Sequence, residues 1–172
     1  MSVRSALSST PVVGFSGSRS PSAACVAAVR AVLPLVRGRV VVGCARGVDA
    51  VVRASVPVAR LRVFRASAFG SGRGALAARS VACVRAVAAA GGVWVSCPGR
   101  ACPAGLVPSR SASACFSGRG SGSWASLALA AGLGVACLVF VPPGVFVPPG
   151  WGLQSLGGGW YWRAGVRQLG LF

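Results

Sequence analysis

The chain has almost no charged residues other than arginine. Among its 172 residues there is no lysine, glutamate or histidine, and Asp49 is the only acid. A paired-carboxylate site needs two acids, a catalytic triad normally needs an imidazole, and most metal sites use histidine or carboxylate ligands. The composition therefore excludes most hydrolytic chemistry within this chain, and we expect neither a bound metal nor another cofactor.

The 18 arginines give the chain a formal net charge of +17. With one acid present, almost none of them can form an ion pair, so their repulsion should lower stability at low salt and be relieved by bound polyanions. Among polyanions, the phosphate backbone of a nucleic acid is the partner that such a positive net charge predicts most directly. An adenine-poor coding strand is a second explanation, since the codons of the missing lysine, glutamate and histidine all carry adenine. This coding explanation stays open for the arginines that lie outside the glycine-rich loop motifs described below.

Hydrophobic residues make up 54% of the chain, so a membrane span has to be considered. The stretch from Trp124 to Val141 reaches the roughly 18 apolar residues that a transmembrane helix needs. However, Gly132-Leu133-Gly134 interrupts it, and the β-branched run that follows ends at Pro142. This pattern predicts a helix, a turn and a buried strand, with no membrane association.

The cellular compartment of the protein can be inferred from its seven cysteines and from its first residues. Serine, threonine, proline and glycine are frequent after Arg4, where a secretory signal would have an apolar segment. An odd cysteine count without such a signal favours a reduced, cytoplasmic protein. Cys97, Cys102 and Cys115 offer three thiolates, but no second close pair follows as zinc sites usually require.

Short β-branched runs alternate with helical patterns in units of about 30 residues. Helices are predicted from Ser22, after Asp49, over 75–90 and over 123–131, and Pro34 should kink or end the first of them. Strands are predicted at 12–15, 39–42, 61–66, 93–96 and 135–141. This alternation implies an α/β fold, a doubly wound Rossmann-like parallel sheet of about five strands with helices on both faces.

The expected domain spans residues 11–141. Residues 1–10 are predicted to be an N-terminal tail, and 142–172 a tail rich in proline, glycine and tryptophan with one edge strand at 160–162. Within the domain, residues 97–115 contain several proline, glycine and serine residues and are predicted to form an irregular excursion from the fold.

Three glycine-rich loops follow predicted strands, where ligands of doubly wound folds bind. Glycine lets the backbone approach a phosphate, and the N–H groups at the start of the next helix favour an anion. Arginines in each loop add fixed positive charge suited to bidentate phosphate contacts. The sequence therefore predicts an anion pocket built from Gly17-Ser18-Arg19, from Gly43 to Asp49 with Arg46 and Gly47, and from Gly118 to Ser123 with Arg119.

These loops, together with Ala78-Arg79-Ser80, resemble the motifs of the DNA processing protein A (DprA/Smf) family. The most specific piece is Gly43-Cys44-Ala45-Arg46-Gly47-Val48-Asp49, which is close to the family's Gly-x-Ala-Arg-Gly-Ile-Asp. The similarity covers about residues 12 to 141. This family belongs to the SLOG group of Rossmann-like proteins, which also includes the LOG nucleotide phosphoribohydrolases.

The resemblance implies a domain that binds nucleotides or single-stranded DNA. Arg19, Arg46 and Arg79 match family positions near the ligand phosphates, and the family's phosphate-binding turn resembles Gly120-Ser121-Gly122-Ser123. Two departures matter. Ser80 stands where the family has asparagine, and the turn lacks the glutamate that helps catalysis in the LOG enzymes. Binding is therefore expected, and glycosidic-bond hydrolysis is not.

Two functions remain open at this stage. The first is a non-catalytic domain that binds a nucleotide or single-stranded nucleic acid, and the second is an enzyme or sensor acting on a small nucleotide derivative. Trp124 is a candidate for stacking on a base or for burial against the sheet. Asp49 would cap its helix, fix Arg46 or contact a ribose hydroxyl, and both the helix start and Arg46 should keep it ionised. Self-association is left open.

Overall fold

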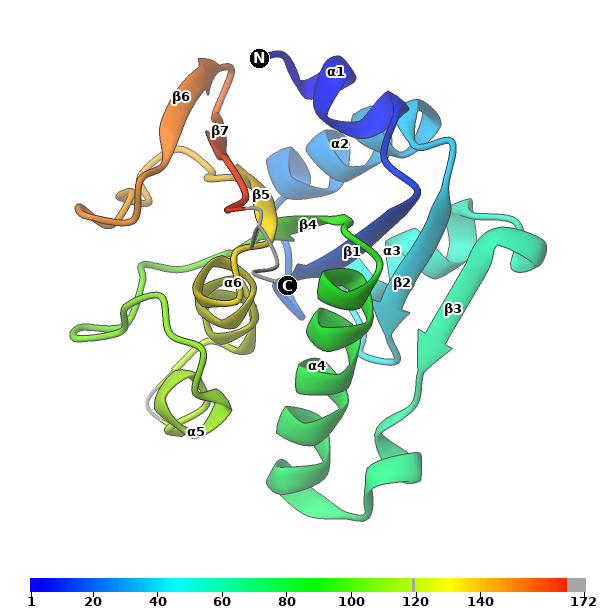
Figure 1. Cartoon of the computed structure of the whole chain (residues 1–172), viewed down its shortest axis with the longest axis vertical. Coiled ribbons are helices and arrows are strands. Elements are labelled where there is room, and N and C mark those ends of the chain that lie inside the picture. The colour runs from blue at the N-terminus through cyan, green and yellow to red at the C-terminus, as the bar shows by residue number, and fades with distance from the viewer. Residues whose placement is uncertain (119, 167–172) are drawn as a thin grey trace, which may run out of the picture.

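The computed structural model describes residues 1–118 and 120–166 and contains one mixed sheet (Figure 1). The spatial order of its strands is β3-β2-β1-β4-β5-β7-β6. Neighbouring strands from β3 to β5 are parallel, whereas β7 runs antiparallel to β5 and to β6. The strands are β1 (Val12–Gly17), β2 (Arg39–Gly43), β3 (Leu61–Phe64), β4 (Val93–Cys97), β5 (Ala136–Phe140), β6 (Gln154–Gly157) and β7 (Trp160–Arg163). The predicted Rossmann-like α/β class is confirmed.

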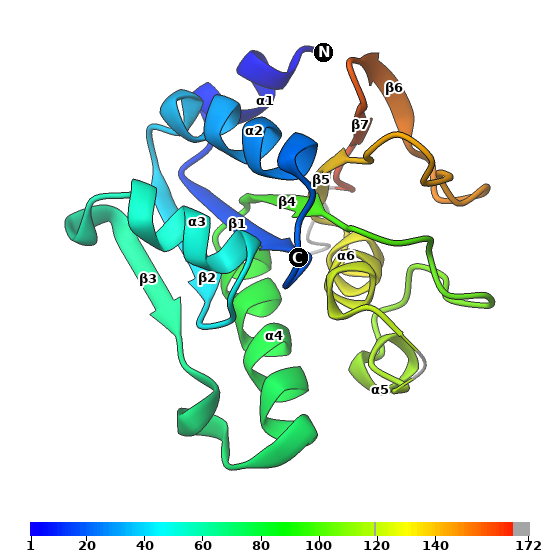
Figure 2. The ribbon, with the colours of Figure 1, turned by 180° about the vertical axis from the view of Figure 1, so that it is seen from behind.

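Helices cover both faces of this sheet (Figures 1 and 2). Helices α2 and α3 lie on one face, and α4 and α6 on the other. The α-helices are α1 (Val3–Ser8), α2 (Ala23–Val32), α3 (Val48–Ser55), α4 (Gly72–Ala89), α5 (Ala112–Cys115) and α6 (Gly122–Gly132). Three short 3-10 helices join them, namely η1 (Leu33–Leu35), η2 (Val58–Arg60) and η3 (Ala66–Phe69).

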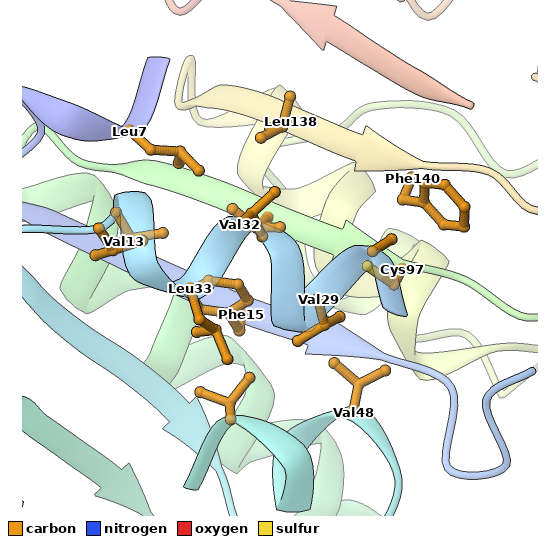
Figure 3. Packing of buried hydrophobic residues seen from close by; sticks show 14 of the residues in the cluster. Leu7, Val13, Phe15, Val29, Val32, Leu33, Val48, Cys97, Leu138 and Phe140 are labelled. Atoms are coloured by element: carbon orange, nitrogen blue, oxygen red, sulfur yellow. The ribbon is translucent and has the colours of Figure 1, made fainter. Parts of the chain in front are cut away.

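Each face of the sheet has its own apolar core, which explains why the central strands β1, β4 and β5 are largely apolar. Val13 and Phe15 point from β1 toward α2 and pack with Val29 (Figure 3). On the opposite face, a Cβ at Gly14 would clash with the ring of Trp94, which is 1% exposed. Glycine at position 14 therefore makes room for the largest side chain of β4.

The long apolar stretch folds as the sequence predicted. Its first part is α6 and its second part is β5, with the turn at Leu133 and Gly134. In the described part of the chain, none of the helices combines the length and the apolar character needed to cross a bilayer. The predicted cap at Ser22 also forms, since its hydroxyl accepts a hydrogen bond from the Cys25 N–H at 3.2 Å.

The two terminal segments contain more structure than expected. Residues 1–10 include α1, which has a capping box between Ser2 and Ser5 and buries Leu7. The strand predicted at 160–162 forms as β7, but it is not at the edge, because β6 pairs with its outer side. Packing of Trp160 on Phe140, with ring centroids 5.3 Å apart, fixes β7 against β5.

Candidate functional site

A cleft of about 1210 Å³ opens at the carboxyl ends of β1, β2 and β4. Residues from α4, from α5 and from the start of α6 line it. Twelve of the residues proposed from the sequence line this cleft, and they come from all three glycine-rich loops and from α4. They are Gly17, Ser18, Arg19, Gly43, Arg46, Asp49, Arg79, Ser80, Gly120, Ser121, Gly122 and Ser123.

Gly47 does not line the cleft, but it joins two of the loops. Its φ of +75° is in the left-handed region, and a Cβ there would clash with the Ser18 carbonyl and the Arg19 backbone. The next N–H, of Val48, donates to the Ser18 carbonyl at 3.0 Å. This close approach brings the loops that carry Arg19 and Arg46 together.

Arg53 holds the β2–α3 loop from behind, a role that the sequence did not indicate. Its Nη1 donates to the carbonyls of Gly43 at 2.8 Å and Ala45 at 2.9 Å. Two hydrogen bonds from one charged group to a loop backbone restrict that loop strongly. Arg46 therefore extends from a loop that is fixed at both ends.

Asp49 and Arg79 form a largely buried ion pair in the lining of the cleft. They are 6% and 9% exposed, and Arg79 Nη1 donates to Asp49 Oδ2 at 3.1 Å. The same oxygen accepts from the Ala45 N–H at 3.2 Å. A Cβ at Gly43 would clash with this guanidinium, so glycine is needed there as well. The ion-pair partner of Asp49 is thus Arg79. The sequence had offered Arg46 as a possible partner.

The surroundings of this pair change the expected ionisation of Asp49. Burial raises the pKa of its carboxyl, although the charge of Arg79, the Ala45 N–H and the charge of Arg53 act in the opposite direction. The sequence had indicated only influences that favour the ionised form, because it could not show the loss of hydration. The charge of Arg79 is neutralised by Asp49. Other arginines must therefore attract an anionic ligand.

Four exposed arginines line the cleft, and the sequence had not assigned two of them to it. Arg19 and Arg46 come from the predicted loops, Arg73 from the first turn of α4, and Arg100 from the excursion at 97–115. The excursion folds back to form a wall of the cleft, which its irregular sequence did not reveal. Arg119, also expected here, lies outside the described residues. The cleft is positive throughout, since its sole acid is already paired.

Trp124 supports the wall that carries Arg100. It is fully buried, its Nε1 donates to the Arg100 carbonyl at 2.7 Å, and its ring meets Trp151 edge-on at 5.5 Å. Of the two alternatives left open by the sequence, the structure shows burial. The indole holds the excursion against α6, so it acts on the cleft from behind.

We expect Trp124→Phe to lower the free energy of unfolding by about 1 kcal/mol, because it removes one hydrogen bond and leaves the Arg100 carbonyl without its donor. The smaller ring also leaves a void at this fully buried position, which adds about 1 kcal/mol to the loss. Urea unfolding measures the loss, with Trp162→Phe as the control, since Trp162 is also buried and its indole makes no hydrogen bond among the described residues. Equal losses in the two variants would show that the bond to Arg100 contributes nothing.

A chain of hydroxyl groups connects the floor of the cleft with α6. Trp94 Nε1 donates to Ser16 Oγ at 3.1 Å, Ser16 Oγ donates to Ser96 Oγ at 3.3 Å, and Ser96 Oγ donates to the Ser123 carbonyl at 3.4 Å. The side chain of Ser121 makes no capping hydrogen bond to the first turn of α6. Gly122 and Ser123 of that turn line the cleft, so their N–H groups are available to an anion bound there.

The remaining polar groups of the cleft are poor candidates for acid–base or nucleophilic chemistry. Burial raises the pKa of Cys83, which lines the cleft, to about 12, so its thiol stays protonated. All seven cysteines are free. Over residues 1–118 and 120–166, no cluster of three or more metal-binding side chains occurs. What the cleft offers is positive charge, backbone N–H groups and hydroxyls.

Comparison with protein-family models, curated proteins and solved structures gave no match to the chain. The fold and the geometry of the cleft are therefore the basis for the function proposed below.

Proposed function

We propose that the chain is a non-catalytic, DprA-like binding domain that holds a nucleotide or single-stranded nucleic acid by its phosphates. The observation that carries this proposal is the basic cleft, in which four exposed arginines surround three glycine-rich loops. Charge-assisted hydrogen bonds from arginine and from N–H groups at the start of α6 suit phosphate oxygens. The free cysteines fit a reducing, cytoplasmic compartment.

The size of the cleft favours a ligand larger than one nucleotide. Its volume of about 1210 Å³ exceeds the range of about 300–1000 Å³ that is usual for small-molecule pockets. The four arginines also reach it from four separate segments, so they can contact successive phosphates. A short single strand uses more of this cleft than a mononucleotide does.

The contacts of Asp49 support binding without catalysis. A general acid or base has to take up and release a proton during the reaction, but the carboxylate of Asp49 neutralises the buried guanidinium of Arg79 through Oδ2. Protonating or displacing the Asp49 carboxylate would leave the buried Arg79 without its counter-charge. We therefore expect no release of free base from nucleoside monophosphates.

One observation favours the alternative, an enzyme or sensor acting on a small nucleotide derivative. Asp49 lines the cleft and burial raises its pKa, which is a property of many catalytic acids. Titration with mononucleotides and with single-stranded oligonucleotides separates the two functions. Tighter binding of oligonucleotides supports our proposal. Base release that Asp49→Asn abolishes while binding persists would establish the alternative.

Arg19→Ala and Arg46→Ala are each expected to weaken binding of a short labelled oligo(dT) by about 1.5–3 kcal/mol, the usual value of hydrogen bonds to charged groups. Fluorescence anisotropy measures the affinity. Arg85→Ala is the matched control, since Arg85 is exposed on α4 but does not line the cleft. Equal losses in all three variants would indicate diffuse attraction by the net charge and would contradict a defined phosphate site.

A further inference from the structure

We propose that a single-stranded nucleic acid held in the cleft continues over the outer edge of β3, along a path formed by Arg62, Phe64, Arg65 and Phe69. This inference rests on the proposed function and extends it to longer strands. The four residues belong to a segment in which arginine and phenylalanine alternate up to Arg73 of the cleft. We call them the β3-edge path.

The β3-edge path adjoins the cleft. β3 is the outermost strand on its side of the described sheet, and Phe64 is paired with Gly43, which lines the cleft. Just beyond it, the Ala66 N–H donates to Cys44 Sγ at 3.2 Å, so the end of β3 lies against the loop of Arg46. η3 then packs on α4, whose first turn carries Arg73 (Figure 1). A strand leaving the cleft meets these residues next.

The side chains of the path suit nucleic acid better than an acidic protein. Arg62 and Arg65 are exposed, and the Arg62 guanidinium lies over the ring of Phe64, 4.5 Å from its centroid. Phe69 is 38% exposed and can stack on a base, whereas Phe64 is half-buried against the core and supports Arg62 from beneath. Single-strand-binding surfaces combine such cations, which follow the backbone, with aromatic rings on which bases stack. An acidic peptide would use the charges but not the exposed ring of Phe69.

Arg60 belongs to the same segment but has another role. Its Nη1 donates to the carbonyls of Val36 at 2.8 Å and Arg37 at 3.3 Å. These bonds connect η2 with the segment before β2. We therefore leave Arg60 out of the path and do not use it as a test position.

The test compares labelled oligo(dT) of about 4 and about 15 nucleotides, which span the site sizes common for single-strand binding. We expect the wild type to bind the longer strand more tightly. The double variant Arg62→Ala/Arg65→Ala and the variant Phe69→Ala should each weaken binding of the longer strand about tenfold and leave the shorter strand unaffected. Arg85→Ala is the control for charge, and circular dichroism confirms that each variant is folded.

The outcomes separate the two proposals. If the short strand binds and lengthening it brings no gain, or if the path variants weaken both strands equally, the β3-edge path is wrong and the cleft stands. If neither strand binds, the proposed function fails as well. If polyglutamate of matched charge displaces the longer strand as well as unlabelled oligo(dT) does, and Phe69→Ala changes nothing, the surface serves acidic proteins and the inference is overturned.

Discussion

Replacing Asp49 with alanine is expected to lower the free energy of unfolding by about 3–5 kcal/mol, the usual cost of removing one member of a buried ion pair. The reason is the environment of Arg79, which is 9% exposed and would lose its counter-charge. Its Nε already has no hydrogen-bond partner among the described residues. Without Asp49, the guanidinium would remain buried with Ser80 Oγ as its remaining partner.

Urea unfolding of wild type, Asp49→Ala and Arg85→Ala tests this prediction. Arg85 is an exposed arginine of the same helix as Arg79, so its variant measures the effect of losing one surface charge. It should change stability by less than about 0.5 kcal/mol. A loss below about 1 kcal/mol in Asp49→Ala would mean that Arg79 finds water or another partner, and the ion pair would then contribute little.

The pH dependence of stability, measured with and without both partners, gives a second test of the same pair. Because burial raises the pKa of Asp49, the folded state holds the proton more tightly than the unfolded state does. Stability due to this group is therefore full below its ordinary pKa of 3.8 and decreases as the pH rises through the folded value. Asp49→Leu/Arg79→Met should recover most of the stability lost in Asp49→Ala and remove this pH dependence.

The order of the elements could be predicted because it depends on local patterns. β-branched runs such as Val40-Val41-Val42 alternate with helical periodicity, and Ser22 provides a cap that forms as expected. The glycine-rich loops could also be placed, since parallel strands bring their carboxyl ends to one edge of the sheet. The fold class and the position of the cleft follow from these two facts.

The contacts within the cleft could not be predicted, because they join residues that are distant in the chain. Arg79 is 30 positions from Asp49, and Trp124 is 24 from Arg100. Neither pair has a periodic signal. The helix α4 also starts at Gly72, inside a stretch that glycine makes look like a loop, and this start is what brings Arg73 into the cleft. In each case tertiary packing outweighed local propensity.

A steep salt dependence is the second large effect that we expect. For single strands, the slope of log affinity against log salt is about −0.7 for each phosphate neutralised. The four exposed arginines of the cleft predict a slope of about −3 for a short oligo(dT). Raising the salt from about 50 to about 200 mM should then weaken binding roughly 50-fold.

The longer strand should give a steeper slope, because Arg62 and Arg65 add two contacts outside the cleft. Six contacts predict a slope of about −4 and a loss of roughly 300-fold over the same salt range. Anisotropy titrations at several salt concentrations measure both slopes, and Arg62→Ala/Arg65→Ala should return the slope of the longer strand to that of the shorter one. Identical slopes would place all contacts in the cleft, and a flat response would exclude phosphate recognition altogether.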